Sequence, residues 1–172
     1  IGVINQTTQL ATDTQAIADY LKSVMIKHYN LNANNIAERF ADTRDTLCYA
    51  TNDNQTAVGG MLNTEADLAI VIGGYNSSNT SHLVELCEQK LPTYFIDNAD
   101  RILNNNELID CNWKTKEQRT VTNFLPTKQP VKILITSGAS CPDALVETVI
   151  RKLAGFFNEE EKVNEIIEEF EV

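Results

Sequence analysis

An apolar run that ends in glycine is the feature that most restricts how this chain can fold. Leu68–Ile72 is a run of five aliphatic residues, and the following Gly73–Ser81 segment is rich in glycine, serine and asparagine. A helical stretch, His82–Leu86, comes next. Glycine lets the backbone turn tightly after a buried strand, and the free N–H groups of a first helical turn attract anions. The segment therefore predicts a strand, an anion-binding loop and a helix.

Side chains in this loop add hydrogen-bond donors to those of the backbone. Ser77, Ser78 and Asn79 lie where the helix is expected to begin. Serine and asparagine are also preferred helix caps, although capping needs only one such residue. Two interpretations stay open: a ligand-binding loop, and a helix cap with surplus polar residues.

The same arrangement occurs a second time. Val131–Ile135 is a second β-branched run. Thr136–Asp143 follows it with Gly138, Ser140 and Pro142, before an amphipathic pattern over Ala144–Phe157. Proline suits a first helical turn, and an acidic residue favours the same end of a helix. Strand-to-helix corners of an open parallel sheet lie together at the carboxyl ends of the strands. The two corners therefore predict one ligand with several anionic oxygens, such as a diphosphate.

Strand and helix patterns alternate along the chain. Apolar runs predict strands at Ile1–Asn5, Leu68–Ile72, Tyr94–Asp97 and around Ile133, with helices between them. The helix after the first strand is expected to bury one face that includes Ile17 and Val24. Residues 98–130 are expected to be irregular, apart from an edge strand at Leu108–Ile109. This order predicts an α/β fold with a parallel sheet covered on both faces, a three-layer α/β/α arrangement.

Composition limits the classes of partner. The 172 residues can bury a core as one domain, or as one domain plus part of another. Lys and Arg number 14 against 24 Asp and Glu, so the net charge of −10 argues against nucleic acid. No apolar stretch approaches the length of a membrane span. Acidic residues gather in 159–171, which predicts a solvated terminal helix.

The four cysteines are far apart in the sequence and form no C-x-x-C pair. This spacing excludes a local zinc knuckle and a thioredoxin-type motif. Cys87 falls on the apolar side of its helix and is expected to be a core residue. Cys48 differs because it precedes a helical pattern, and a thiol at a helix N-terminus has a lowered pKa and can bind a metal. A lone cysteine can equally be a buried structural residue.

Four motifs in a fixed order carry a resemblance to a known family. They are Asn5-Gln6-Thr7-Thr8, Cys48-Tyr49-Ala50-Thr51 with Gln55, Asn76-Ser77-Ser78-Asn79-Thr80, and Thr136-Ser137-Gly138-Ala139-Ser140 with Pro142-Asp143. Together they resemble the LytB/IspH family of 4-hydroxy-3-methylbut-2-enyl diphosphate (HMBPP) reductases, which end the non-mevalonate pathway of isoprene biosynthesis. The resemblance runs from residue 3 to about residue 156. The wording Gly73–His82 and the longer central loop look most like the plant and cyanobacterial branch.

The resemblance implies a fold and a cofactor. Members have three α/β domains around a cavity that holds a 4Fe-4S cluster, bound by one cysteine from each domain. Cys48 matches the last of the three. One iron stays open for the hydroxyl oxygen of the substrate, and HMBPP is reduced to isopentenyl diphosphate (IPP) and dimethylallyl diphosphate (DMAPP). An electron donor such as ferredoxin or flavodoxin is implied, with a cytoplasmic location in bacteria or a plastid location in eukaryotes.

The resemblance also implies the substrate-binding residues. Ser77, Asn79 and Ser140 match residues that bind the diphosphate, and Ser78 lies beside them. Thr7 matches a threonine that lines the pocket near the reacting end. One position departs from the family, because Asn54 stands where the family usually has an arginine in its T-x-x-R-Q motif.

The other functional residues of the family match nothing in this chain. Two cluster cysteines, two diphosphate-binding histidines and a proton-relaying glutamate would lie before Ile1. The sequence, which starts without methionine, is therefore expected to be a fragment that lacks the N-terminal domain, cannot hold the cluster alone and is inactive. The expected divisions are residues 1–44, a βα remnant of the preceding domain, residues 45–157, a complete four-stranded C-terminal domain, and residues 158–172, the acidic helix. The first strand would need a partner, for example in a dimer of the fragment.

Two other functions stay open from the residues alone. One is a non-catalytic α/β module that binds a diphosphate metabolite or a protein partner, because serine- and glycine-rich corners occur in many such domains. The other is a hydrolase with Cys48 as nucleophile, for which the sequence offers no recognisable histidine partner.

Overall fold

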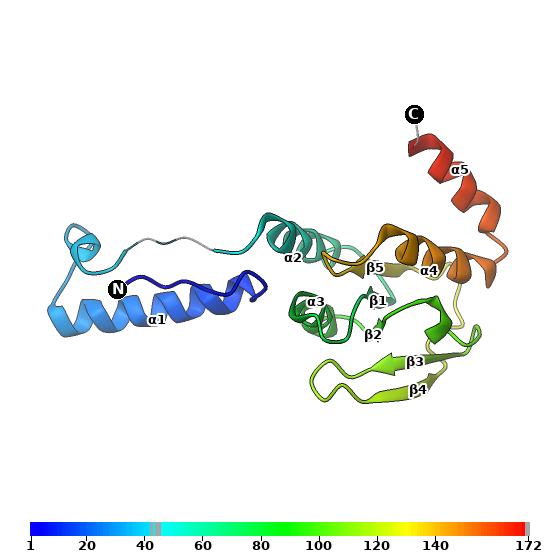
Figure 1. Ribbon diagram of the computed structural model, residues 1–172, viewed down its shortest axis with the longest axis horizontal. Coiled ribbons are helices and arrows are strands. Elements are labelled where there is room, and N and C mark those ends of the chain that lie inside the picture. Colours follow the sequence, from blue (N-terminus) through cyan, green and yellow to red (C-terminus); the bar gives the residue numbers. More distant parts are fainter. Residues whose placement is uncertain (42, 44–45, 171–172) are drawn as a thin grey trace. The chain divides into compact units, whose positions relative to one another are not determined.

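The computed structural model describes residues 1–41, 43 and 46–170. The chain divides into two compact units at residue 56, residues 1–56 and the rest of the chain. Figure 1 labels the helices and strands in chain order. None of the helices in these ranges combines the length and the apolar character that crossing a bilayer requires.

The first unit contains one long helix, α1 (Ala11–Tyr29), a short 3-10 helix, η1 (Ile36–Glu38), and the start of α2 (Tyr49–Met61). The predicted buried face of α1 is wrong: Ile17 is 55% and Val24 44% exposed, and Thr14 is the buried residue of this helix. The apolar spacing of α1 is correct for a helix, but within the described residues few side chains cover it.

The predicted strand at Ile1–Asn5 is also wrong, because these residues form no strand. The segment is extended and is hydrogen-bonded to Arg39, Ala41, Thr43 and Thr46. The Ala41 N–H donates to the Ile1 carbonyl oxygen (2.7 Å), and the Asn5 N–H donates to Thr46 Oγ1 (2.9 Å). The backbone of this segment is therefore hydrogen-bonded partly to backbone and partly to side chains, and no regular strand ladder forms. The dimer expected through this strand stays a prediction.

The second unit is built on a parallel sheet with the strand order β2–β1–β5. Its strands are β1 (Leu68–Ile72), β2 (Thr93–Ile96) and β5 (Ile133–Ser137). All five residues of β1 are buried because this strand lies in the middle, between two neighbours and two layers of helix. The register pairs Ile72 with Ile96 on one side and with Ser137 on the other.

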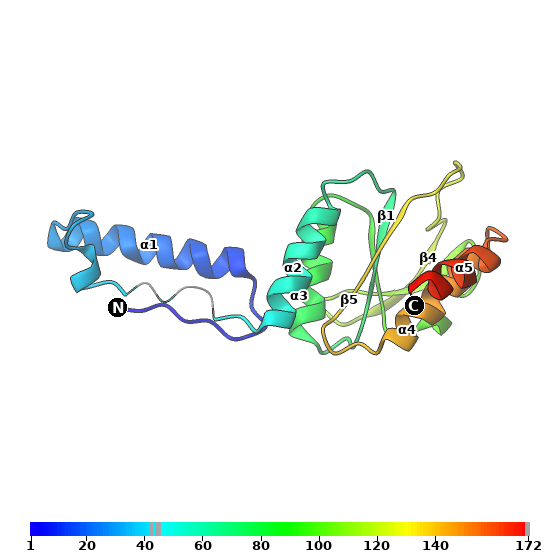
Figure 2. The same ribbon diagram turned by 90° about the horizontal axis from the view of Figure 1, so that it is seen from above.

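Helices cover both faces of this sheet (Figure 2). Leu83 and Cys87 of α3 (Ser78–Glu88) and Val58 at the end of α2 pack with Ala69 and Val71 on one face. On the other face, Val149 and Leu153 of α4 (Asp143–Gly155) pack with the even-numbered residues of β1. Alternate residues of β1 thus face opposite layers, as strand geometry requires. The predicted three-layer α/β/α fold is confirmed.

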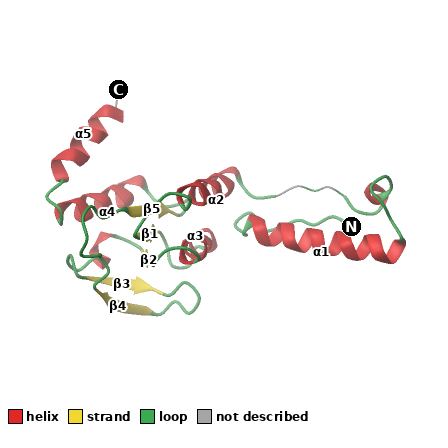
Figure 3. Ribbon diagram, turned by 180° about the vertical axis from the view of Figure 1, so that it is seen from behind, coloured by secondary structure: helices red, strands yellow, loops and turns green. Residues whose placement is uncertain are grey.

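The sequence predicted a domain of four strands, and this strand count is wrong. The described residues contain three parallel strands and a separate antiparallel hairpin, β3 (Glu107–Cys111) and β4 (Gln118–Thr122), drawn as two yellow arrows in Figure 3. β3 includes the predicted edge strand Leu108–Ile109. β4 falls in the stretch predicted to be irregular, and its residues are exposed apart from a half-buried Val121, so it carried little apolar signal.

The hairpin is hydrogen-bonded to the parallel sheet by a buried carboxylate, that of Asp110. Asp110 of β3 is 4% exposed, and its Oδ1 accepts a hydrogen bond from the Phe95 N–H of β2 (3.0 Å). Its Oδ2 accepts from Arg119 of β4 (Nε, 3.1 Å). A side chain of the hairpin thus replaces a backbone partner at the outer side of β2, which is an edge of the parallel sheet.

Two helices complete this unit. The 3-10 helix η2 (Ala99–Arg101) follows β2, and α5 (Glu160–Phe170) follows α4. The acidic terminal helix expected from the sequence is therefore confirmed as a helix. The strand expected around Ile133 and the helix expected from Ala144 are also confirmed, with shifts of a few residues at their ends.

Candidate functional site

The first serine loop joins β1 to α3. Its turn begins at Gly73, whose φ of 154° lies in a region that residues with a Cβ rarely adopt, and whose N–H donates to the Ile96 carbonyl oxygen (3.0 Å). Ser77 is the N-cap of α3, because its side chain accepts a hydrogen bond from the Thr80 N–H (3.3 Å). One serine of the loop is therefore a cap, as the alternative interpretation expected. Ser78 and Asn79 remain unexplained by capping.

Asn79 and Thr80 are buried polar residues at the start of α3. Asn79 is 5% and Thr80 1% exposed. Among the described residues, neither polar atom of the Asn79 amide group nor Thr80 Oγ1 has a hydrogen-bond partner. Buried polar groups in folded proteins are nearly always hydrogen-bonded, so each exception needs a reason. A ligand that accepts hydrogen bonds would give the Asn79 amide nitrogen a partner.

The second serine loop joins β5 to α4. The Cys141 N–H donates to the Gly138 carbonyl oxygen (2.8 Å), which closes a tight turn, and Ser140 lies exposed within it. Pro142 is the residue before α4, and Asp143 is the first residue of that helix. The proline was expected inside the first turn and lies one position earlier. The acidic residue lies at the positive end of α4, as expected.

Thr80 joins the two loops. A Cβ atom on Gly73 would lie 2.8 Å from Thr80 Oγ1, and a Cβ atom on Gly138 would lie 2.1 Å from the same oxygen. The Gly138 N–H also donates to the Ile72 carbonyl oxygen at the end of β1 (2.9 Å). The two serine-bearing corners therefore meet at the carboxyl ends of β1 and β5, as the parallel sheet predicted. Sequence reasoning missed Thr80, although a glycine in each loop indicated a close approach.

Three side chains at the first loop and the end of β2, those of Tyr75, Asp97 and Arg101, form a group that the sequence analysis did not identify. Tyr75 packs edge-on against Phe95 (5.1 Å between ring centroids), and burial raises the pKa of Tyr75 to about 12. Asp97, directly after β2, pairs with Arg101 (2.8 Å), and this guanidinium lowers the pKa of the Asp97 carboxyl. The signal for this group was an acidic residue followed four positions later by arginine at the end of a strand.

Cys48 lies in the first unit, immediately before α2. Its Sγ lies 3.0 Å from Thr51 Oγ1 and accepts a hydrogen bond from the Thr51 N–H (3.4 Å). The Thr51 hydroxyl, followed by the Thr51 amide, lowers the pKa of the exposed Cys48 thiol. The sequence predicted this effect from the position of the thiol at a helix N-terminus.

Thr7 and Cys48 are joined by a backbone hydrogen bond. The Cys48 N–H donates to the Thr7 carbonyl oxygen (3.4 Å), and the Thr7 side chain is exposed. Gln55 holds the chain between Thr7 and α1, since it donates to the Gln9 carbonyl oxygen (2.9 Å) and accepts from the Ala11 N–H (3.2 Å). The threonine and glutamine of the second motif thus both support the surroundings of Cys48.

The remaining cysteines do not resemble Cys48. Cys87 is fully buried, and burial raises the pKa of its thiol to about 11. Burial also raises the thiol pKa of Cys111 and of the half-buried Cys141. Cys87 is therefore the core residue that the sequence predicted, and Cys48 is the one of the four cysteines whose thiol pKa is lowered.

Cys48 has the donor chemistry of an iron–sulfur cluster ligand. Iron–sulfur clusters are bound by thiolates, and Cys48 offers an exposed thiol with a lowered pKa. No group of three or more His, Cys, Asp or Glu side chains within the described residues is arranged to hold a metal. Cys48 therefore fits as a single ligand of such a cluster, and the described chain does not supply a complete set.

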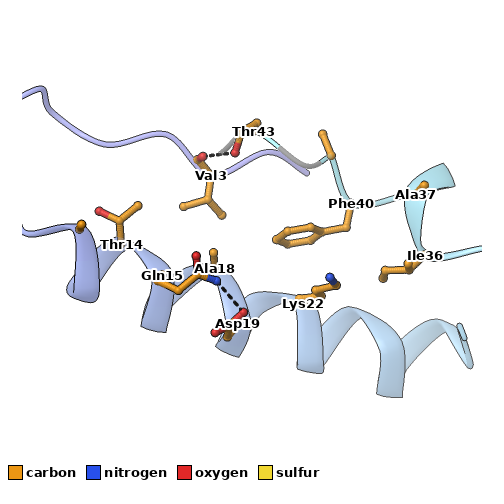
Figure 4. Close-up of a pocket in the computed structure, with 12 residues that line it drawn as sticks. Val3, Thr14, Gln15, Ala18, Asp19, Lys22, Ile36, Ala37, Phe40 and Thr43 are labelled. Atoms are coloured by element: carbon orange, nitrogen blue, oxygen red, sulfur yellow. Dashed lines mark hydrogen bonds between the residues drawn. The ribbon is translucent and has the colours of Figure 1, made fainter. Parts of the chain in front are cut away.

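The first unit also contains a cavity of about 280 Å³ between α1 and the N-terminal segment. Figure 4 shows Val3, Thr14 and Phe40 among its lining side chains. Asp19 beside them accepts a hydrogen bond from Gln15 (2.9 Å). None of the six predicted site residues lines this cavity.

Comparisons with known proteins agree with the motifs. A family model described as LytB protein matches residues 1–154. The chain is 41% identical over 157 residues to the 4-hydroxy-3-methylbut-2-enyl diphosphate reductase of Trichodesmium erythraeum, covering 89% of this chain and 37% of the relative. The reductase of Picosynechococcus is 40% identical over 154 residues, again covering 89% of this chain and 37% of the relative.

A solved structure supports the fold. The Plasmodium falciparum E-1-hydroxy-2-methyl-but-2-enyl-4-diphosphate reductase superposes with a TM-score of 0.54 at 23% identity, covering 89% of this chain and 38% of that protein. The chain spans a little over a third of the length of the curated relatives that it matches. The family model covers most of the sequence, and the chain belongs to the LytB family.

Proposed function

We propose that this chain forms the C-terminal part of an HMBPP reductase, where it binds the substrate diphosphate and supplies one cysteine to a 4Fe-4S cluster. The observation that carries the proposal is the buried Asn79 amide without a partner at the start of α3, beside the two serine loops that meet at Thr80. The names of the relatives support the reaction class.

Four residues bind the diphosphate in this proposal. Ser77 Oγ already accepts from the Thr80 N–H, so its hydroxyl hydrogen is left to donate to a phosphate oxygen. Ser78 and Ser140 have exposed hydroxyls that donate in the same way, and Asn79 donates through its amide nitrogen. Holding the diphosphate fixes the position of the reacting allylic end, so binding energy remote from that end contributes to catalysis.

Cys48 and Thr7 act at the reacting end. The Cys48 thiolate, stabilised by Thr51, binds one iron of the cluster, and the Thr7 hydroxyl lines the pocket beside it. When bound, the cluster supplies electrons and an open iron that weakens the carbon–oxygen bond of the substrate. The 172-residue chain alone offers one thiolate ligand among its described residues, so we propose that it neither holds the cluster nor catalyses the reaction by itself.

The remaining expectations belong to the same proposal. The electron donor is a small redox protein such as ferredoxin or flavodoxin, and the products are IPP and DMAPP. The location is cytoplasmic in a bacterium or plastid in a eukaryote. The division into residues 1–44, 45–157 and 158–172 is kept as the domain organisation within the reductase.

The test uses a reductase polypeptide that contains this chain. Asn79→Ala should raise KM for HMBPP about tenfold or more, because a hydrogen bond to a charged group is lost. Asn76→Ala, a change of the exposed asparagine in the same loop, is the matched control and should leave KM within about twofold. Cys48→Ser should remove the broad visible absorbance of the cluster.

Two outcomes would contradict the proposal. An unchanged KM in Asn79→Ala would remove the diphosphate role of the first loop. A colourless polypeptide that still binds diphosphate would instead favour the non-catalytic binding module. The 172-residue chain, supplied with iron and sulfide, should stay colourless.

A further inference from the structure

The turn of the β3–β4 hairpin lies against α3. Trp113 Nε1 donates to Glu88 Oε2 (2.9 Å), and Lys116 Nζ donates to Ser81 Oγ (3.1 Å). Ser81 and Glu88 are seven positions apart and so lie on the same side of the helix. Two side chains of the turn therefore attach it to α3, one near the end of that helix and one near its start.

The backbone of the turn is fixed at Lys116. The Lys116 N–H donates to the Asn112 carbonyl oxygen (2.8 Å), and the Asn112 side chain accepts from the Lys114 and Thr115 N–H groups (2.9 and 3.0 Å). Lys116 has a φ of 63°, in the left-handed region that few residues other than glycine and asparagine adopt. The surrounding hydrogen bonds therefore hold Lys116 in a conformation that a lysine does not prefer.

The Lys116 ammonium group lies beside the first turn of α3. Ser81 is 6% exposed and is the fourth residue of this helix, one turn after the Ser77 cap. Within the part of the chain that the structure describes, no carboxylate forms an ion pair with Lys116. A cation near the positive end of a helix is unfavourable unless an anion is also present.

Two groups at the start of α3 are incompletely paired within the described residues. The Lys116 ammonium has a hydrogen bond to Ser81 but no ion pair, and the buried side-chain amide of Asn79 has no hydrogen-bond partner. A bound anion would pair with both groups, because phosphate oxygens accept hydrogen bonds from an amide and attract an ammonium charge. The serine loops contribute only neutral donors, and the chain carries a net charge of −10, so a local cation matters for a multiply charged ligand.

We propose that Lys116, presented by the turn of the β3–β4 hairpin, is a further binding residue for the diphosphate held at the start of α3. This inference depends on the proposed function of that site. The lysine adds a positive charge to the neutral donors of the two serine loops. Ser81 positions the ammonium group through its hydroxyl, and Trp113 anchors the turn.

The test measures binding of inorganic pyrophosphate to the 172-residue chain by calorimetry at low and high salt. Lys116→Met should weaken binding about fivefold at low salt, as expected for an exposed charge pair, and the difference should shrink as salt is added. Lys116→Arg keeps the charge and should bind within about twofold of the original chain. Ser81→Ala keeps the charge but loses the positioning bond, so its effect should be smaller than that of Lys116→Met.

Lys114→Met is the matched control because Lys114 belongs to the same turn, with its ammonium over the Trp113 ring (4.9 Å to the centroid). It should not change pyrophosphate binding, and the fluorescence of Trp113 should report the same unfolding midpoint in both methionine variants. An equal effect of the two methionine variants would overturn a specific role for Lys116.

The experiment distinguishes a wrong assignment of Lys116 from a wrong assignment of the whole diphosphate site. If Asn79→Ala weakens pyrophosphate binding and Lys116→Met does not, the inference about Lys116 is wrong while the proposed site stands. If the original chain binds no pyrophosphate, the site itself is refuted, and Lys116 with it.

Discussion

Replacing Gly138 with alanine should force the two serine loops apart, because Thr80 already occupies the space that the new methyl group needs. The added Cβ atom would lie 2.1 Å from Thr80 Oγ1 and 3.2 Å from Thr80 Cβ. Thr80 is 1% exposed, so its side chain has no solvent to move into. Gly138 does not have the left-handed backbone of Gly73, so the expected effect is steric.

The magnitude follows from the contacts. Adding a methyl group to a packed interior costs about 1–3 kcal/mol, and the 2.1 Å contact places Gly138→Ala near the upper end of this range. Thr80→Ala removes the hydroxyl oxygen, leaving the 3.2 Å contact with Cβ, and costs about 1 kcal/mol for the lost methyl group. In the double variant the alanine at 138 should therefore cost less than about 1 kcal/mol, which gives a favourable coupling energy of about 2 kcal/mol.

The assay is urea unfolding followed by the fluorescence of Trp113, the single tryptophan, which lies in the second unit. With an m value of about 1–3 kcal/mol/M in urea, a loss of about 1 kcal/mol should lower the midpoint of urea unfolding by about 0.3–1 M. Gly74→Ala is the matched control, because no atom lies within 4 Å of its added Cβ. If Gly138→Ala costs the same with threonine or alanine at position 80, Thr80 does not separate the loops and the reasoning fails.

Three further predictions follow from single contacts. Asp110→Ala should lower the free energy of unfolding by about 1–3 kcal/mol, because the Phe95 N–H loses its acceptor. Asp110→Asn should lower it by less, and equal losses of the two variants in urea unfolding would contradict this prediction. Iodoacetamide should label Cys48 before the other cysteines, as measured by mass spectrometry. Thr51→Val should slow the labelling of Cys48, because it removes the hydroxyl that contributes most to the lowered pKa of this thiol. The pKa of Asp97 is lowered in the folded chain, so its stabilising effect is present above the unfolded value of about 4 and is lost as pH falls through the folded value. Asp97→Asn should therefore flatten the acid limb of a stability–pH curve, and an unchanged limb would refute the assignment.

Local patterns predicted the parts of the fold that depend on burial. The aliphatic run of β1 is buried on both faces, and the glycines after β1 and β5 mark where the loops approach each other. The polar strand β4 was not predictable, because its register comes from pairing with β3 and from Arg119 binding Asp110. The first segment, Ile1–Asn5, has the composition of a strand, but its backbone groups are hydrogen-bonded to the Thr46 side chain and the Ala41 backbone instead of to a neighbouring strand.

In the candidate site, too, the residues with local roles were predictable from the sequence and those with long-range contacts were not. Ser77 and Cys48 were identified because capping and helix N-termini are local effects. Thr80 and the Tyr75–Asp97–Arg101 group were missed because their roles depend on contacts between different strands and loops. A sequence pattern does not show which polar side chain becomes buried without a partner, as Asn79 does.

The pairing of Ile72 with Ser137 has a consequence for how this site can vary. Adjacent strands lie about 4.8 Å apart whatever their side chains, because backbone hydrogen bonds set that spacing. The interval between the starting points of the two serine loops is therefore independent of the residues that bind the ligand. Substitutions in either loop can alter affinity or selectivity one at a time, while the span available to a pair of linked phosphate groups stays constant.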